Sequence, residues 1–114
     1  MKTLAEINLL PNERAAIQAA AKTLRENLPI SQIILFGSKA RGDSDEESDI
    51  DLLLLTKHRL SMEEESRAID LIYPIQLEHD AYFGLVDIPE EEWFHGVYQV
   101  MPLRHEVDRD GVTV

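Results

Sequence analysis

The feature that most constrains the fold is the segment DIDLLLLT at residues 49–56, in which two aspartates precede four leucines. A short, continuous apolar run is typical of a strand buried on both faces of a sheet. Side chains alternate along a strand, so Asp49 and Asp51 share one face, with Cα atoms about 6.6 Å apart. Two like charges at the start of a buried strand are costly unless a cation or a substrate compensates them. The segment therefore predicts a core strand with a binding site at its mouth.

Proline, glycine and capping residues divide the remaining sequence into helices and strands. The expected elements begin with a helix from Pro11 to before Pro29, whose apolar stripe is Ile17, Ala20, Ala21 and Leu24, followed by a strand over 31–36 ended by Gly37 and a helix over 61–73 with a Ser61/Glu64 capping box and a stop at Pro74. They continue with a third strand over 75–86 that has a bulge or turn at Gly84, a helix from Pro89 that Pro102 bends or ends, and a charged tail with a turn at Asp110–Gly111. The acidic run Asp43–Glu47 is expected to be a solvated loop. This order predicts an α/β or α+β fold, a small mixed sheet flanked by helices.

Length and composition set further limits. The 114 residues predict one domain over 1–114, and the chain has no cysteine for disulfides or thiolate metal sites. Eleven Lys and Arg stand against 22 Asp and Glu, a net charge of -11, which disfavours direct nucleic-acid binding and favours cations or a basic partner protein. No apolar run is long enough for a bilayer and no secretion signal is visible, so a cytoplasmic protein that does not enter membranes is expected.

A third acid from a neighbouring strand would complete a site for two metal ions beside Asp49 and Asp51. In the expected third strand, Glu78 and Asp80 share one face, and either could be that ligand. Carboxylate oxygens are the ligands that Mg²⁺ prefers. The sequence thus predicts a magnesium site whose third ligand is left open between two residues.

The second half of the candidate site is the stretch GSKARG after the first strand. Gly37 allows close approach of the backbone to an anion, and the N–H groups at a helix start attract phosphate. Ser38 adds a hydroxyl donor, and Lys39 and Arg41 could supply positive charge, although one of them could point into solvent. A phosphate cradle beside a cation site predicts binding of a nucleoside triphosphate.

The combination of Gly37, Ser38, Gly42, Asp49 and Asp51 in this strand context resembles the nucleotidyltransferase superfamily, which includes DNA polymerase β, and most closely its minimal nucleotidyltransferases. The resemblance implies that Asp49 and Asp51 hold Mg²⁺, with two ions expected. It also implies that Gly37 and Ser38, with Arg41 nearby, bind ATP, and that a later strand carries a third catalytic and metal-binding carboxylate. Asp80 is the better positional match for this carboxylate and Glu78 the reserve.

Minimal nucleotidyltransferases are commonly paired with helical toxin ribonucleases of the HEPN fold, for which they act as antitoxins. The resemblance therefore implies transfer of AMP to a hydroxyl, such as a tyrosine of a HEPN toxin. Two alternatives stay open: an antitoxin that neutralises its toxin by contact alone, and a small-molecule nucleotidyltransferase resembling those that modify aminoglycosides. A homo-oligomer is also possible.

Overall fold

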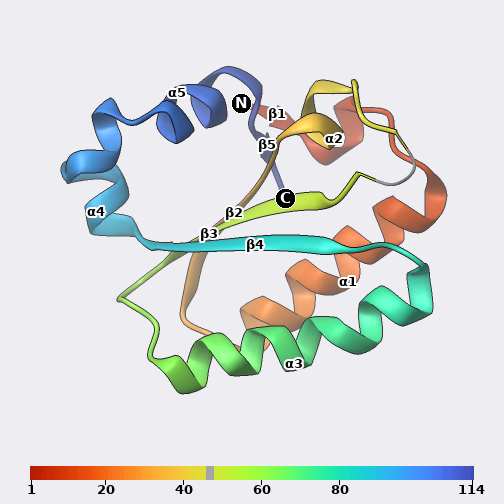
Figure 1. The fold of residues 1–114 in the computed structure, drawn as a ribbon, viewed down its shortest axis with the longest axis horizontal. Helices are drawn as coiled ribbons and strands as arrows, with labels where there is room; N and C mark the ends of the chain where they lie inside the picture. Colours follow the sequence, from red (N-terminus) through yellow and green to blue (C-terminus); the bar gives the residue numbers. More distant parts are fainter. Residues whose placement is uncertain (46–47) are drawn as a thin grey trace.

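The protein folds into a five-stranded mixed sheet with helices on both faces (Figure 1). The computed structural model describes residues 1–45 and 48–114. The expected solvated loop over 43–47 therefore lies partly outside the described residues. The elements are β1 (Lys2–Thr3), a 3₁₀ turn η1 (Leu4–Glu6), α1 (Pro11–Asn27), β2 (Ile30–Phe36), α2 (Ser38–Arg41), β3 (Ile50–Thr56), α3 (Met62–His79), β4 (Phe83–Pro89), α4 (Glu90–His95), η2 (Val97–Val100), α5 (Pro102–Asp110) and β5 (Val112–Thr113).

The order of the strands is β1-β5-β2-β3-β4. β3 runs antiparallel to β2 and parallel to β4, and β5 lies between β1 and β2. β3 is thus covered on both edges, and the four leucines of the opening segment are at most 1% exposed. The predicted α/β class and the predicted central strand are both confirmed.

Two apolar cores cover the two faces of the sheet, as Figure 1 shows with α1 and α3 on one face and α4 and α5 on the other. The larger core packs the expected stripe of α1 (Ile17, Ala20, Ala21, Leu24) against α3 and alternate residues of β2 and β3. The smaller core joins Trp93 and Val107 to the opposite residues of these strands, including Leu53 and Leu55. Asp51 follows the alternation of the second set and therefore lies on the face that carries α5.

The expected helix stop at Pro74 is wrong, and so is the expected start of the third strand at residue 75. The capping box of Ser61 and Glu64 starts α3 as expected, but the helix continues through Pro74 to His79. Pro74 is exposed, and the apolar spacing continues past it with Ile72 and Ile75 buried. Burial of this stripe outweighs the hydrogen bond that proline removes. The third strand begins only at Phe83.

The C-terminal region also differs from the expectation of one helix followed by a charged tail with a turn at Asp110–Gly111. The chain leaves α4 at Gly96, where a side chain would meet the Glu92 carbonyl oxygen at 2.6 Å. After η2, the charged segment 102–110 is helix α5, and Val112–Thr113 enters the sheet as β5. Among the described helices, none combines the length and apolar character needed to cross a bilayer.

Candidate active site

The carboxylate of Asp51 lies in a slot between two glycines that belong to different strands. A Cβ atom built on Gly37, at the end of β2, would stand 2.3 Å from Asp51 Oδ2. One built on Gly84, the β4 residue paired with Asp51, would stand 3.0 Å from Oδ1. Asp51 lies on β3, and its two carboxylate oxygens are directed toward the two neighbouring strands: Oδ2 toward Gly37 at the end of β2, and Oδ1 toward Gly84 of β4.

Gly37 and Ser38 form the sharp turn from β2 into α2. Gly37 has φ +76° and ψ −158°, a conformation open essentially to glycine alone. Its carbonyl oxygen accepts the N–H groups of Ala40 and Arg41, both at 3.1 Å. The N–H groups of the first helical residues have no acceptor within a helix, so those of Ser38 and Lys39 are donors suited to an anion. The turn puts this end of α2 next to Asp51, as the site requires.

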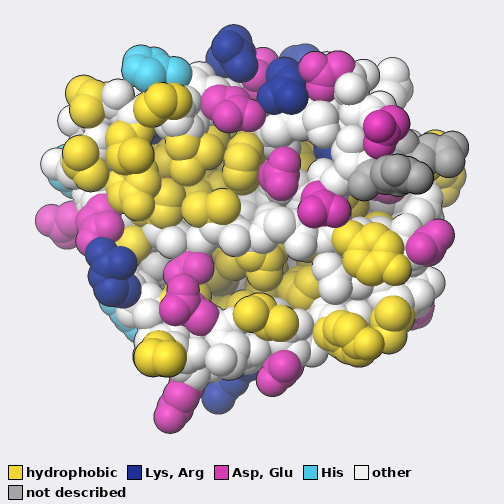
Figure 2. Space-filling view, in the orientation of Figure 1, with side chains coloured by type: hydrophobic (Ala, Val, Ile, Leu, Met, Phe, Trp, Pro, Cys, Tyr) yellow, Lys and Arg dark blue, Asp and Glu magenta, His cyan; other side chains and the backbone are white. Residues whose placement is uncertain are grey.

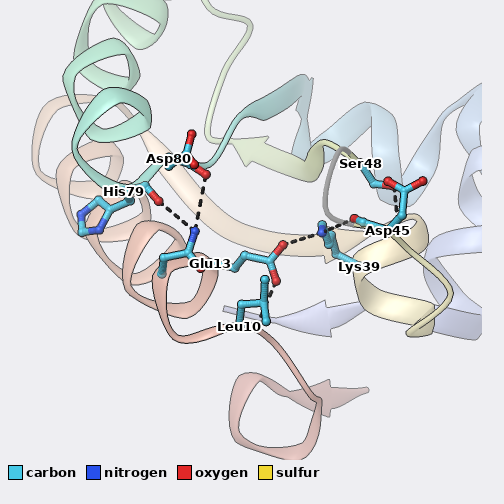
Figure 3. Close-up of polar contacts among 8 residues, drawn as sticks. Leu10, Glu13, Lys39, Asp45, Ser48, His79 and Asp80 are labelled. Carbon is cyan, nitrogen blue, oxygen red and sulfur yellow. Dashed lines mark hydrogen bonds and ion pairs between the residues drawn. The ribbon is translucent and has the colours of Figure 1, made fainter.

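The side chain of Lys39, unlike its backbone N–H, belongs to the buried scaffold. Its side chain is 4% exposed, forms an ion pair with Glu13 of α1 and donates to the Asp45 carbonyl oxygen at 2.9 Å (Figure 3). Ser48 in turn donates to Asp45 Oδ1 at 3.1 Å, just before Asp49. The buried lysine thus holds the backbone of Asp45, to which Ser48 is bonded in turn, and the expected positive charge at the site does not come from this lysine.

Arg41 is the cation of α2 that faces the acidic site. It forms ion pairs with Asp43 and with Glu106 of α5, both at 3.1 Å. Burial raises the pKa of the Asp51 carboxyl, and the negative charge of Asp49 raises this pKa further. Glu106 adds to the rise in the pKa of Asp51, and the guanidinium of Arg41 lowers that pKa. Figure 2 shows the setting: acidic side chains gather on this face around a few basic ones.

The structure does not bring Glu78 and Asp80 onto a strand beside Asp51. Glu78 lies in the last turn of α3, and Asp80 ends that helix with a left-handed φ of +50°. The amide of Asn12 donates to the backbone oxygens of His79 and Asp80, which ties this helix end to α1 (Figure 3). Asp80 lines a hollow with Ile50, whose side chain belongs to the α1–α3 core. The expected third ligand therefore lies toward the face of the sheet opposite Asp51.

The acid that β4 does carry also points away from the site. Asp87 interacts with Glu65 of α3 and raises the pKa of that carboxyl, on the opposite face from Asp51. Among residues 1–45 and 48–114, no three Asp, Glu or His side chains are arranged to hold a metal ion. Asp49 and Asp51 have the donor chemistry for one divalent cation, with remaining ligands from phosphates and water. The described residues do not fit a three-carboxylate, two-metal site.

Three residues of this site were not predicted from the sequence to take part in it. Gly84 was expected to be a bulge or turn; its register opposite Asp51 becomes visible only once the strand starts at Phe83. Glu106 lies in the segment expected to be a charged tail, for which no helix was predicted. Glu13 gave no signal beyond its place in the first turn of α1, and its partner Lys39 was expected near the phosphates.

The chain is similar in sequence to known nucleotidyltransferases. The sequence profile of the nucleotidyltransferase domain family matches residues 17–98. MJ0141 of Methanocaldococcus jannaschii, a candidate protein adenylyltransferase, is 43% identical over 51 residues, which are 45% of this chain and 52% of that protein. A second such protein of the same organism, MJ0604, is 50% identical over 46 residues, 39% of this chain and 46% of that protein. The matched part spans about half the length of these relatives.

Solved structures extend the agreement in fold. A toxin–antitoxin structure with AMP-PNP has TM-score 0.60 and 25% identity, over 91% of this chain and 72% of that chain. A tri-AMPylated HEPN toxin of Shewanella oneidensis in complex with its MNT antitoxin has TM-score 0.55 and 22% identity, over 89% and 70%. Because the family profile covers most of the sequence and the fold agrees, the chain belongs to the nucleotidyltransferase domain family.

Proposed function

We propose that this chain transfers AMP from ATP to a hydroxyl group of a partner protein, such as a tyrosine of a HEPN-type toxin, and so acts as an antitoxin. The observation that carries the proposal is the Asp51 carboxylate held against the Gly37–Ser38 turn, in a member of the nucleotidyltransferase family. The relatives named for protein adenylylation and the neighbouring toxin–antitoxin structures support a protein acceptor.

The reaction joins the acceptor oxygen to the α-phosphorus of ATP and breaks the bond from this phosphorus to the oxygen bridging to the β-phosphate. Pyrophosphate leaves, and the hydroxyl proton passes to a carboxylate of the site. We assign this proton to Asp51, whose carboxylate lies against the Gly37–Ser38 turn. The turn at Gly37 and Ser38 positions the triphosphate through backbone N–H groups. A Mg²⁺ ion held by Asp49 and Asp51 would neutralise the charge that develops on the phosphate oxygens.

An exposed apolar patch beside the site supports a protein as the acceptor. Large apolar side chains of β4, α4, η2 and the residue after them are between 37% and 77% exposed (Val86, Phe94, Val97, Val100, Met101). Figure 2 shows a continuous hydrophobic area on this side of the molecule, over α4. Exposed apolar patches of this kind mark interaction surfaces, protein–protein interfaces among them, and the patch therefore agrees with a protein acceptor.

The test is transfer of label from α-³²P-ATP, with Mg²⁺, to the protein encoded by the adjacent gene. Asp49→Asn and Asp51→Asn should each lower the transfer rate by about a hundredfold or more, as loss of one key electrostatic contact does. Asp87→Asn is the matched control, since it removes an acid of the next strand on the opposite face, and it should leave the rate unchanged. Undiminished transfer by Asp51→Asn would overturn the assignment.

Toxin neutralisation by contact alone is the second candidate function. It is favoured because, in the described part of the chain, no three acidic or histidine side chains are arranged to hold a metal ion. The two candidates differ in one outcome. If contact suffices, Asp51→Asn still protects cells from the toxin, whereas an antitoxin that works by AMP transfer loses protection together with labelling.

A further inference from the structure

Position 84 is where an acid from the neighbouring strand would meet Asp51. The two residues are paired across β3 and β4, so their side chains share one face. The Cβ position at Gly84 is only 3.0 Å from Asp51 Oδ1. A carboxylate on this carbon would therefore lie beside that of Asp51, the arrangement from which two-metal sites are built.

The backbone does not require a glycine at this position. In the described part of the chain, the residues with positive φ are Gly37, Gly42 and Asp80, and Gly84 is not among them. The nearest atom to its Cβ position belongs to a side-chain carboxylate, which can move by a few tenths of an ångström. What Gly84 contributes is thus the absence of a side chain next to Asp51.

Other described acids near this position are committed elsewhere. Asp87 faces Glu65 on the other side of the sheet. Glu106 is on the correct face, but Arg41 binds its carboxylate at 3.1 Å. Neither can act as the missing ligand without losing its present interaction.

We propose that Gly84 limits this site to one firmly held divalent cation, bound by Asp49 and Asp51, and that an aspartate at position 84 would create a second cation site. The inference rests on the proposed function in that the same carboxylates serve nucleotidyl transfer. It goes beyond that function because it identifies the residue that sets the metal stoichiometry of the site. The number of bound ions can be measured without any transfer reaction.

The experiment is a Mn²⁺ titration followed by electron paramagnetic resonance, on the full chain without nucleotide, at about 0.15 M salt to screen the acidic surface. A bound Mn²⁺ ion is assigned to the site when it is no longer bound by the double variant that combines Asp49→Asn with Asp51→Asn. The wild type should hold one such ion. Gly84→Asp should hold two, because the added carboxylate supplies further oxygen ligands beside Asp51.

Gly84→Asn is the matched control, because it has the same shape without the charge and should still hold one ion. The proposal is overturned if the wild type holds two site-specific ions or none, or if Gly84→Asp holds no more of these ions than Gly84→Asn. The wild-type count decides by itself should Gly84→Asp fail to fold. Absence of AMP transfer, by contrast, would contradict the proposed function and leave these counts unaltered.

Discussion

The glycines on the two sides of Asp51 are alike in sequence and opposite in what they do. Gly37 is buried, has a φ of +76° and leaves no room for a Cβ atom, which would be 2.3 Å from the carboxylate. Gly84 is half-buried on the edge strand β4, has no left-handed φ and faces a carboxylate that can move aside. The fold requires glycine at position 37. At position 84 the fold accepts other residues, and we expect glycine there to affect only the surroundings of the Asp51 carboxylate.

The largest change in the free energy of unfolding should come from Lys39, which ties the helix after Gly37 to Glu13 of α1. Lys39→Met leaves Glu13 charged and buried, so the free energy of unfolding should fall by about 3–5 kcal/mol, as for other broken buried pairs. Urea unfolding measures this loss. Adding Glu13→Gln should restore much of it, because the amide carries no charge and its oxygen can still accept from the Leu10 N–H. Arg41→Met, on an exposed cation, is the comparison; equal losses for Lys39 and Arg41 would contradict the scaffold role.

Gly37→Ala tests directly whether the structure requires glycine at position 37. The backbone conformation alone should cost about 1–3 kcal/mol, and the methyl group must also displace the Asp51 carboxylate. Gly42→Ala is the control, because its φ is +83° but nothing lies within 4 Å of its Cβ position. The difference between the two unfolding free energies reports the clash together with the greater backbone strain at Gly37, because Gly42 has a ψ of 13° and lies in the less costly left-handed helical region. Equal losses would mean that Asp51 does not lie against the turn.

Asp51→Asn should stabilise the metal-free protein, measured as a rise of a few degrees in Tm in EDTA at neutral pH. Burial and the charges of Asp49 and Glu106 raise the pKa of Asp51 in the folded state, so its ionised form opposes folding. The wild type therefore loses stability as the pH rises through this raised pKa. The advantage of the variant should vanish below the ordinary aspartate pKa of about 4, where Asp51 is protonated in both states. A constant difference at all pH values would rule out this cause.

The smallest effect should come from Gly84→Ala. The added methyl group fits an ordinary strand conformation, and the carboxylate of Asp51 can yield slightly. Loss of backbone entropy in the unfolded chain offsets this contact, so the unfolding free energy should change by less than about 1 kcal/mol. Thermal unfolding beside Gly37→Ala makes the contrast. A loss as large as that of Gly37→Ala would show that both glycines are structural requirements.

The sequence predicted the parts of this molecule that local patterns control. The leucine run, the stripe of α1 and the Ser61/Glu64 capping box each depend on neighbours a few residues away, and all three appear as expected. The Gly37 turn was predictable for the same reason.

What could not be predicted depends on partners distant in the chain. Burial of Ile72 and Ile75 carries α3 past Pro74, and this moves the start of the next strand to Phe83. Because side chains alternate, the revised strand puts Gly84 opposite Asp51 and Asp87 on the other face. The pairing of Lys39 with Glu13 likewise needs α1 and α2 to be packed together, which no spacing of residues announces.

The two-residue strand β5 has a consequence for how the site forms. It joins the sheet between β1 and β2, and Val114 is bound both to Ile33 and to Arg25. These contacts link segments from opposite ends of the sequence, and such closures are entropically expensive and slow. Since β5 directly follows α5, which brings Val107 into the smaller core and Glu106 to Arg41, that side of the site should assemble last and open first. Hydrogen exchange would then be fastest there and slowest in β3.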